Sequence, residues 1–233
     1  MQHDVYDYTA HTVSKNTVLQ KTYRLLGLSF IPAVVGAAFA AGMNFNFYAA
    51  FGSRWVSLIA FLVFFYGMTY LIEKNRYSNT GVTLLMVFTF GIGVLISPVL
   101  QYALNIADGA KIVGIAAAMT AAVFLTMSVL ARRSRLNMNE LARFLTVGAV
   151  ILMVAVILMV AVIANLFLGI HALTLTISAG FVLFSSLMIM WQVRTVIDGG
   201  EDSHISAALT LFISLYNIFS SLLNILLSLN GDD

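Results

Sequence analysis

Charged residues are absent from six long stretches of this chain. The stretches cover residues 25–53, 55–72, 77–107, 112–131, 144–193 and 203–231. A helix needs about 20 predominantly apolar residues to cross the ~30 Å hydrocarbon core of a bilayer, and each stretch is about that long or longer. Only 9% of the 233 residues are charged, whereas a soluble domain carries roughly 25%. The chain is therefore predicted to be a membrane protein that crosses the bilayer several times.

Two of these stretches are not a single uninterrupted span. Residues 144–193 are too long for one crossing and break near Gly169–His171, and residues 77–107 begin with a polar turn at 77–81. The run at 149–168 does not alternate apolar and polar residues, which excludes the strands of a membrane β-barrel. The sequence predicts an all-α polytopic membrane protein with seven helices, at about 25–43, 55–72, 81–104, 112–131, 144–168, 172–193 and 205–229.

Lys and Arg are distributed unevenly between the two sides of this arrangement. The N-terminal tail and the loops on its side hold ten of the twelve, and the opposite side holds two, Arg54 and Lys111. Cytoplasmic loops carry the excess of Lys and Arg. We therefore expect residues 1–21 to form a cytoplasmic tail, residues 22–233 to form the membrane domain, and the C-terminus to lie on the outer side. The basic cluster Arg132, Arg133 and Arg135 is first an orientation signal, with anionic lipid or a partner protein as possible contacts.

Small residues spaced four apart occur in two of the predicted spans. Membrane helices associate by close packing, which such spacing permits. Gly36 and Ala40 in the first span, and Gly114, Ala118 and Ala122 in the fourth, are predicted to be helix contacts.

The predicted seventh span carries polar residues along one face. They follow one another at steps of three or four: Ser206, Thr210, Ser214, Asn217, Ser221, Asn224 and Ser228. A polar stripe facing lipid is unfavourable, so it should face protein or water. Hydrogen bonding between helices and a polar conduit both account for it. In either case we expect this last helix in the middle of the bundle.

Several chemistries lack the residues that they need. The chain has no cysteine, its four lysines lie at span ends or in the tail, and no carboxylate lies inside a predicted span core. No metalloprotease, hydrolase or phosphate-binding motif occurs, and four scattered histidines form no ligand cluster. We expect no catalytic residue, no metal, no cofactor and no enzymatic activity. The net charge of +2 is too small to indicate a nucleic-acid partner.

The last helix and the turn before it resemble a known family. The segment GGEDSHISAALTLFISLYNIFSSLLNIL at 199–226 is similar to the C-terminal signature of the Bax-inhibitor family, in its bacterial branch that modulates the FtsH protease. Residues 17–30, 97–100 and 164–167 also resemble it. The resemblance implies six helices around a central seventh, and a bacterial inner-membrane protein that binds and restrains the ATP-dependent protease FtsH and its prohibitin-like complex. A protease-engaging tail would then include His3, Tyr6, Tyr8 and His11.

The same resemblance implies an alternative function. Members of this family also conduct a pH-sensitive calcium leak, attributed to one aspartate in the sixth span and one in the seventh. By the motif, Gln192 and Ser214 stand at these positions. Two neighbouring carboxylates titrate as a coupled pair and attract a divalent cation, and a glutamine and a serine do neither. We therefore favour protease regulation over a cation leak lined by Asn165, Gln192, Ser214 and Asn217.

Overall fold

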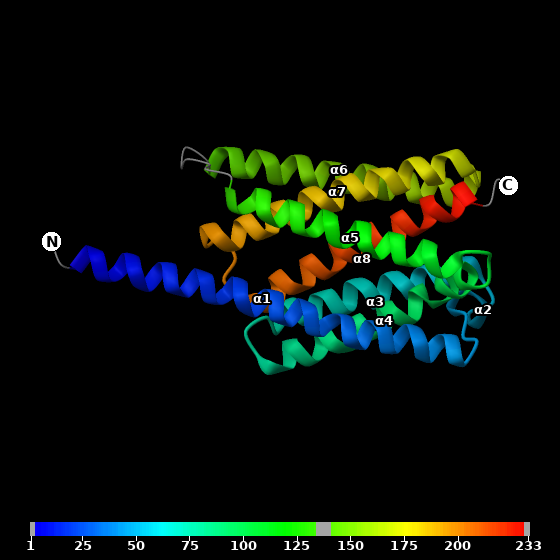
Figure 1. Cartoon of the computed structure of the whole chain (residues 1–233), viewed down its shortest axis with the longest axis horizontal. Coiled ribbons are helices and arrows are strands. Elements are labelled where there is room, and N and C mark those ends of the chain that lie inside the picture. Colours follow the sequence, from blue (N-terminus) through cyan, green and yellow to red (C-terminus); the bar gives the residue numbers. More distant parts are fainter. Residues whose placement is uncertain (1–2, 134–140, 231–233) are drawn as a thin grey trace. The chain divides into compact units, whose positions relative to one another are not determined.

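The computed structural model describes residues 3–133 and 141–230 of the backbone. The side chains it describes lie within 17–133 and 150–230, apart from Tyr48, Arg54, Leu152, Leu166 and Phe167. This part of the chain is all-helical. Its elements in chain order are α1 (His3–Gly42), α2 (Phe47–Ala50), α3 (Arg54–Lys74), α4 (Asn79–Leu104), α5 (Gly109–Arg133), α6 (Leu141–Leu168), α7 (His171–Asp198) and α8 (His204–Asn230), as Figure 1 shows.

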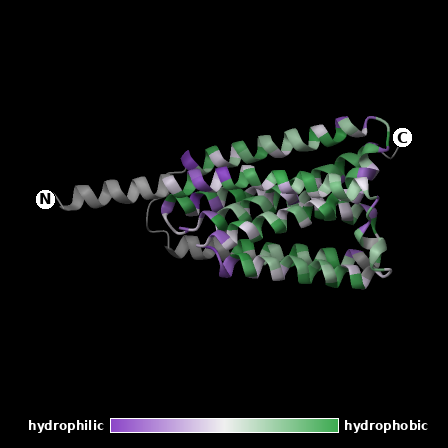
Figure 2. Cartoon of the chain, turned by 90° about the horizontal axis from the view of Figure 1, so that it is seen from below, coloured by the Kyte–Doolittle hydropathy of each residue, from purple (hydrophilic) through white to green (hydrophobic). Residues whose placement is uncertain are grey.

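Six of these helices are long and apolar enough to cross a membrane: α1 from Thr17 onward, α3 from Trp55 onward, α4, α5, α7 and α8. The remaining long helix, α6, has 28 residues, and its stretch Met153–Asn165 is apolar. Hydrophobic residues cover the lengths of the helices, and hydrophilic residues gather at their ends (Figure 2). The predicted polytopic helical protein is confirmed, and each of the seven predicted spans coincides with a long helix.

The ends of the helices differ from the predicted ends of the spans. The helix α1 begins well before residue 25, where the prediction placed the first span, and α7 continues to Asp198, although the prediction ended that span at 193. Lys21, Arg24 and Arg194 lie inside these helices because a charge marks the edge of the bilayer and does not end a helix. The short helix α2 was not predicted. Because α1 runs from His3, residue 21 is no boundary of secondary structure, and the cytoplasmic tail stays a prediction.

The chain forms two compact units, and α7 and α8 each contribute residues to both of them. Unit 1 comprises residues 1–109 and 195–212, and unit 2 comprises residues 110–194 and 213–233. Within unit 1, α1 and α3 both pack on α4. The contact between α1 and α4 is close at two glycines, because a Cβ at Gly36 would overlap the carbonyl of Phe90 and one at Gly93 would overlap the carbonyl of Ala33. The predicted helix contact at Gly36 is confirmed.

Aromatic side chains form the core of unit 1. Phe88 of α4 is fully buried and lies with its ring 5.9 Å from Phe64 and 5.7 Å from Phe65, both of α3. Phe212 of α8 lies 6.4 Å from Phe88 and 5.6 Å from Phe30 of α1. These ring distances fall in the range of favourable aromatic pairs. The first part of α8 thus packs on α1 and α4 through Phe212.

Unit 2 contains α5, α6, α7 and the later part of α8. A Cβ at Gly180 of α7 would lie 2.8 Å from Leu158 of α6, so these two helices approach closely at that glycine. The predicted contacts at Gly114, Ala118 and Ala122 are wrong for packing within the part of the chain that the structure describes. All three residues are exposed, and a Cβ at Gly114 would meet nothing within 4 Å.

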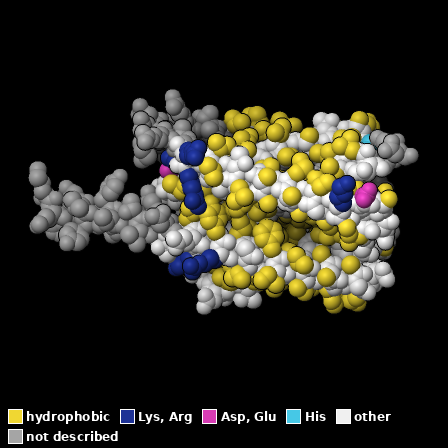
Figure 3. Space-filling model, in the orientation of Figure 1, with side chains coloured by type: hydrophobic (Ala, Val, Ile, Leu, Met, Phe, Trp, Pro, Cys, Tyr) yellow, Lys and Arg dark blue, Asp and Glu magenta, His cyan; other side chains and the backbone are white. Residues whose placement is uncertain are grey.

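The last helix, α8, is the most buried of the six spans. In the most apolar 18-residue stretch of α8, half of the residues are buried, whereas the buried share in the corresponding stretches of the other five helices is 11–39%. The expectation that the polar-striped helix avoids lipid agrees with this burial. On the face in Figure 3, hydrophobic side chains cover the middle of the helices, and Lys and Arg lie towards their ends, as expected of a protein in a bilayer.

Candidate functional site: a polar cluster at the start of α8

The turn between α7 and α8 is built by two glycines. Gly199 has a φ of +80°, which ends α7 after Asp198 and which residues with a Cβ rarely adopt. The N–H groups of Gly200 and Glu201 then donate to the carbonyl oxygen of Thr195, at 2.9 and 3.3 Å. This turn places the carboxylates of Glu201 and Asp202 directly before the first residue of α8.

Ser203 caps the N-terminus of α8 and ties it to the turn between α3 and α4. Its Oγ accepts a hydrogen bond from the backbone N–H of Ser206 at 3.2 Å, which is the usual N-cap contact with the third helical residue. The same Oγ donates to the carbonyl oxygen of Arg76 at 2.6 Å. Ser203 is only 1% exposed, so both hydrogen bonds are shielded from water.

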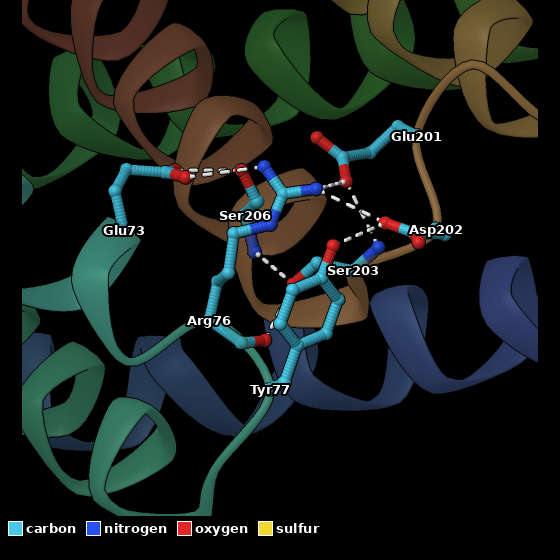
Figure 4. A network of polar contacts seen from close by, with 7 residues as sticks. All are labelled: Glu73, Arg76, Tyr77, Glu201, Asp202, Ser203 and Ser206. Atoms are coloured by element: carbon cyan, nitrogen blue, oxygen red, sulfur yellow. Dashed lines mark hydrogen bonds and ion pairs between the residues drawn. The ribbon is translucent and has the colours of Figure 1, made fainter.

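The guanidinium group of Arg76 joins the two turns (Figure 4). Its Nη2 lies 2.9 Å from Oε1 of Glu201 and 3.0 Å from Oδ1 of Asp202. Its Nη1 lies 3.6 Å from Oε2 of Glu73, which precedes it by three residues. The guanidinium carbon also lies 5.0 Å from the ring centre of Tyr77, within the range of a cation–π contact.

Each of the three carboxylates has a further donor. The hydroxyl of Tyr77 donates to Asp202 at 2.8 Å, the hydroxyl of Ser206 donates to Glu73 at 2.6 Å, and the backbone N–H of Ser203 donates to Glu201 at 2.8 Å. Three negative groups therefore share one positive one. The excess negative charge lies at the N-terminus of α8, where the helix dipole favours it. We call Glu73, Arg76, Tyr77, Glu201, Asp202, Ser203 and Ser206 the polar cluster.

The charges of the polar cluster are fixed by its own contacts. Burial alone would lower the pKa of Arg76, but the charge of Glu201 and the hydrogen bond to Asp202 outweigh it and raise the pKa. The hydrogen bond that Tyr77 donates to Asp202 raises the pKa of the phenol and lowers that of the carboxyl, whose hydrogen bond with Arg76 lowers it further. Asp202 is thus ionised and Tyr77 neutral at physiological pH.

This arrangement fixes two turns of unit 1 to one another. No group of three or more His, Asp or Glu in the described part of the chain is placed to hold a metal. Its hydrogen bonds and ion pairs connect residues about 125 positions apart and fix one end of unit 1. Tyr77 is 71% exposed and so is the side chain of Asp202, which leaves a polar surface open to a partner.

The structure brings one predicted stripe residue, Ser206, into the polar cluster. Ser214 and Ser221 are buried farther along α8, Thr210 and Asn217 are half-buried, and Asn224 is exposed. The stripe is therefore shielded over most of its length and open near its end.

Gln192 and Asn165 lie in unit 2. Gln192 is 3% exposed on α7. Asn165 holds the turn after α6, because its Nδ2 donates to Oγ1 of Thr174 at 2.7 Å and its Oδ1 accepts from the N–H of Ile170 at 3.0 Å. Gly169, with a φ of +61°, makes this turn possible and confirms the predicted break between the two spans. The amide of Asn165 thus has a structural role.

The predicted basic cluster and tail are only partly described. Arg132 and Arg133 are exposed at the end of α5. Next to them, Nη1 of Arg194 lies 3.4 Å from the carbonyl oxygen of Ala131, where a cation suits the C-terminus of a helix. Outside the described residues or side chains lie Arg135 and the predicted tail residues His3, Tyr6, Tyr8 and His11.

Sequence reasoning missed most of the polar cluster. Arg76 was counted there only among the Lys and Arg that indicate topology, and Glu201 and Asp202 were used only as part of the segment 199–226 that resembles the family. A signal was present, because Ser203 stands at a typical capping position before a helical stripe, and opposite charges occur in two loops expected on the same side of the membrane.

Comparison with known proteins assigns the chain to a family. The family profile described as "Inhibitor of apoptosis-promoting Bax1" matches residues 15–231. An uncharacterised protein of Neisseria meningitidis serogroup B is 85% identical over the whole of both chains. The Escherichia coli K12 protein named modulator of FtsH protease YccA is 33% identical over 92% of this chain and 91% of its own. An uncharacterised Pseudomonas aeruginosa protein is 35% identical over 93% of this chain and 91% of its own. This polytopic helical membrane protein belongs to the Bax inhibitor-1 family.

Proposed function

We propose that the chain is a non-enzymatic regulator that binds and restrains an FtsH-type membrane protease. The observation that carries the proposal is the similarity to the E. coli modulator of FtsH protease, which leaves less than a tenth of either chain unmatched. The corresponding protein of a second E. coli strain is named an inner membrane protein. We accordingly place this chain in the bacterial inner membrane, with the protease and its prohibitin-like complex as partners.

The polar cluster suits such a role. In the orientation proposed from the Lys and Arg counts, it lies on the cytoplasmic side, where an ATP-dependent protease works. There it holds two turns in one geometry and exposes Tyr77 and Asp202. A preformed surface loses little conformational freedom on binding, which favours affinity.

The packing of unit 1 supports restraint by occupancy. A protein that engages a protease without being degraded must resist extraction from the membrane. The contacts of Gly36 and Gly93 across α1 and α4, and the aromatic core around Phe88, provide this resistance. The protease would hold the chain without rapidly unfolding it, so its other substrates would be processed more slowly.

A cation leak gated by protonation has less support. Gln192 and Ser214 are 3% and 4% exposed, and neither side chain titrates in the physiological range. A pair of buried carboxylates that could change charge with pH is therefore missing at these positions. Liposomes containing the purified protein should show no calcium or proton flux between about pH 6 and 8. This range is centred on neutral pH, where such a carboxylate pair would have to change its protonation state.

Affinity capture tests the proposed partnership. The tagged chain is expressed in its host, solubilised in mild detergent and recovered with its bound membrane proteins. FtsH and the prohibitin-like proteins should be enriched over a capture with an unrelated polytopic membrane protein. Equal recovery from both captures, with the tagged chain intact, would contradict the proposal. A variant lacking residues 1–18 then shows whether the tail contributes to binding.

A further inference from the structure

Hydroxyl groups on the membrane-spanning helices are usually satisfied within their own helix. The hydroxyl of Ser29 donates to the carbonyl oxygen of Leu25, four residues earlier, at 2.7 Å. Thr120 on α5 and Ser186 on α7 make the same contact at 2.7 and 2.6 Å. This contact lets a polar side chain lie in an apolar environment without another partner.

Two buried serines of unit 2 depart from this pattern. Ser128 on α5 is 7% exposed and Ser185 on α7 is 1% exposed. The Oγ atom of each is buried and has no hydrogen-bond partner among the described residues. A buried hydroxyl without a partner is unfavourable, and almost all such groups in proteins are bonded to protein or to ordered water.

Ser185 belongs to a polar line along α7. Ser178, Ser185 and Gln192 follow at intervals of seven residues, close to two helical turns, and all three are buried. The contact between Arg194 and the carbonyl of Ala131 brings the ends of α5 and α7 together. Ser128 and Gln192 lie within one turn of that contact on their respective helices. Unit 2 thus holds one buried serine near the end of α5, where the end of α7 is close, and three buried polar residues spaced along α7.

We propose that Ser128 and Ser185 bind ordered water, which hydrates a polar seam along α7 inside unit 2. Water is the smallest molecule that both donates to and accepts from a hydroxyl, and buried water usually serves groups that the protein leaves unsatisfied. This hydration is independent of protease modulation.

The absence of cysteine makes a direct test possible. Single variants Ser128→Cys and Ser185→Cys are compared with Thr120→Cys and Ser186→Cys. These controls are buried to a similar degree, at 8% and 6% exposed, on the same two helices, but their hydroxyls bond to the backbone. X-ray radiolysis generates hydroxyl radicals from bound water as well as from bulk water, so cysteine oxidation reports a neighbouring water.

The expected result is faster oxidation at positions 128 and 185 than at the two control positions, in variants that purify as a single folded species. Equal oxidation rates within each pair would overturn the proposal. Thermal unfolding of the Ser185→Ala variant provides a second measurement. A lower midpoint supports a bonded water at this hydroxyl, whereas an unchanged or higher midpoint indicates that the variant merely removes an unsatisfied group and contradicts the proposal.

Discussion

Replacing Arg76 by glutamine tests the energetic role of the polar cluster. The variant removes the positive charge that Glu73, Glu201 and Asp202 share. Hydrogen bonds to charged groups contribute about 1.5–3 kcal/mol when shielded, and exposed ion pairs contribute about 0.2–1 kcal/mol. The side chain of Glu201 is 13% exposed, that of Asp202 is 71% exposed, and that of Arg76 is 30% exposed. Allowing for this solvent screening, we expect Arg76→Gln to lower the free energy of unfolding by about 2 kcal/mol.

The assay is reversible unfolding in mixed detergent micelles, followed by helicity at increasing SDS. Arg133→Gln is the matched control, because it removes the same charge from an exposed position at the end of α5. A double-mutant cycle of Arg76→Gln with Glu201→Gln should give a coupling energy of about 1 kcal/mol. The reasoning is refuted if Arg76→Gln destabilises the protein no more than Arg133→Gln does, or if the cycle shows no coupling.

Three further predictions concern the contact between α1 and α4, the cap of α8 and the pH dependence of stability. Gly93→Val forces a side chain against the backbone of α1 and should cost about 1–3 kcal/mol, whereas Gly114→Ala, on an open surface, should be neutral or slightly stabilising in the same unfolding assay. Ser203→Ala removes the cap of α8 and should cost about 1 kcal/mol; an unchanged stability would speak against the cap. The pKa of Asp202 is lowered from 3.8, so its contribution is present above that pH and lost on further acidification, while the raised pKa of Tyr77 preserves its contribution until above pH 10. The stability difference between the wild type and a Tyr77→Phe variant isolates this contact, and it should be constant between these limits; a steep change of that difference near neutral pH would contradict the assignment.

The helices could be predicted from the sequence because their determinants are local. Long charge-free stretches identify membrane spans whatever the helices pack against, and Gly169 marks the turn between α6 and α7 by its backbone freedom alone. The ends were less accurate, since Lys21 and Arg194 mark the bilayer edge while the helices continue beyond them. The polar face of α8 was recognised from its spacing, and its burial follows from the cost of exposing it to lipid.

The polar cluster could not be predicted because its contacts are not local. Arg76 and Glu201 are 125 residues apart, and neither their sequence positions nor their charges specify that they meet. Small residues are ambiguous for the same reason. Gly36 and Gly114 both begin a small-residue pattern, but among the described residues Gly36 meets another helix and Gly114 does not. Asn165 was similarly named as a residue that could line a central leak, and its contacts are with the turn next to it.

Reconstituted proteolysis tests the central claim most directly. Purified FtsH from the same host is placed in proteoliposomes with a membrane substrate and ATP, with or without an equimolar amount of this protein. The proposal predicts slower degradation of the substrate when the folded protein is present, and no slowing when an unrelated polytopic protein replaces it. An unchanged degradation rate, with the protein intact and inserted in the same vesicles, would contradict the claim.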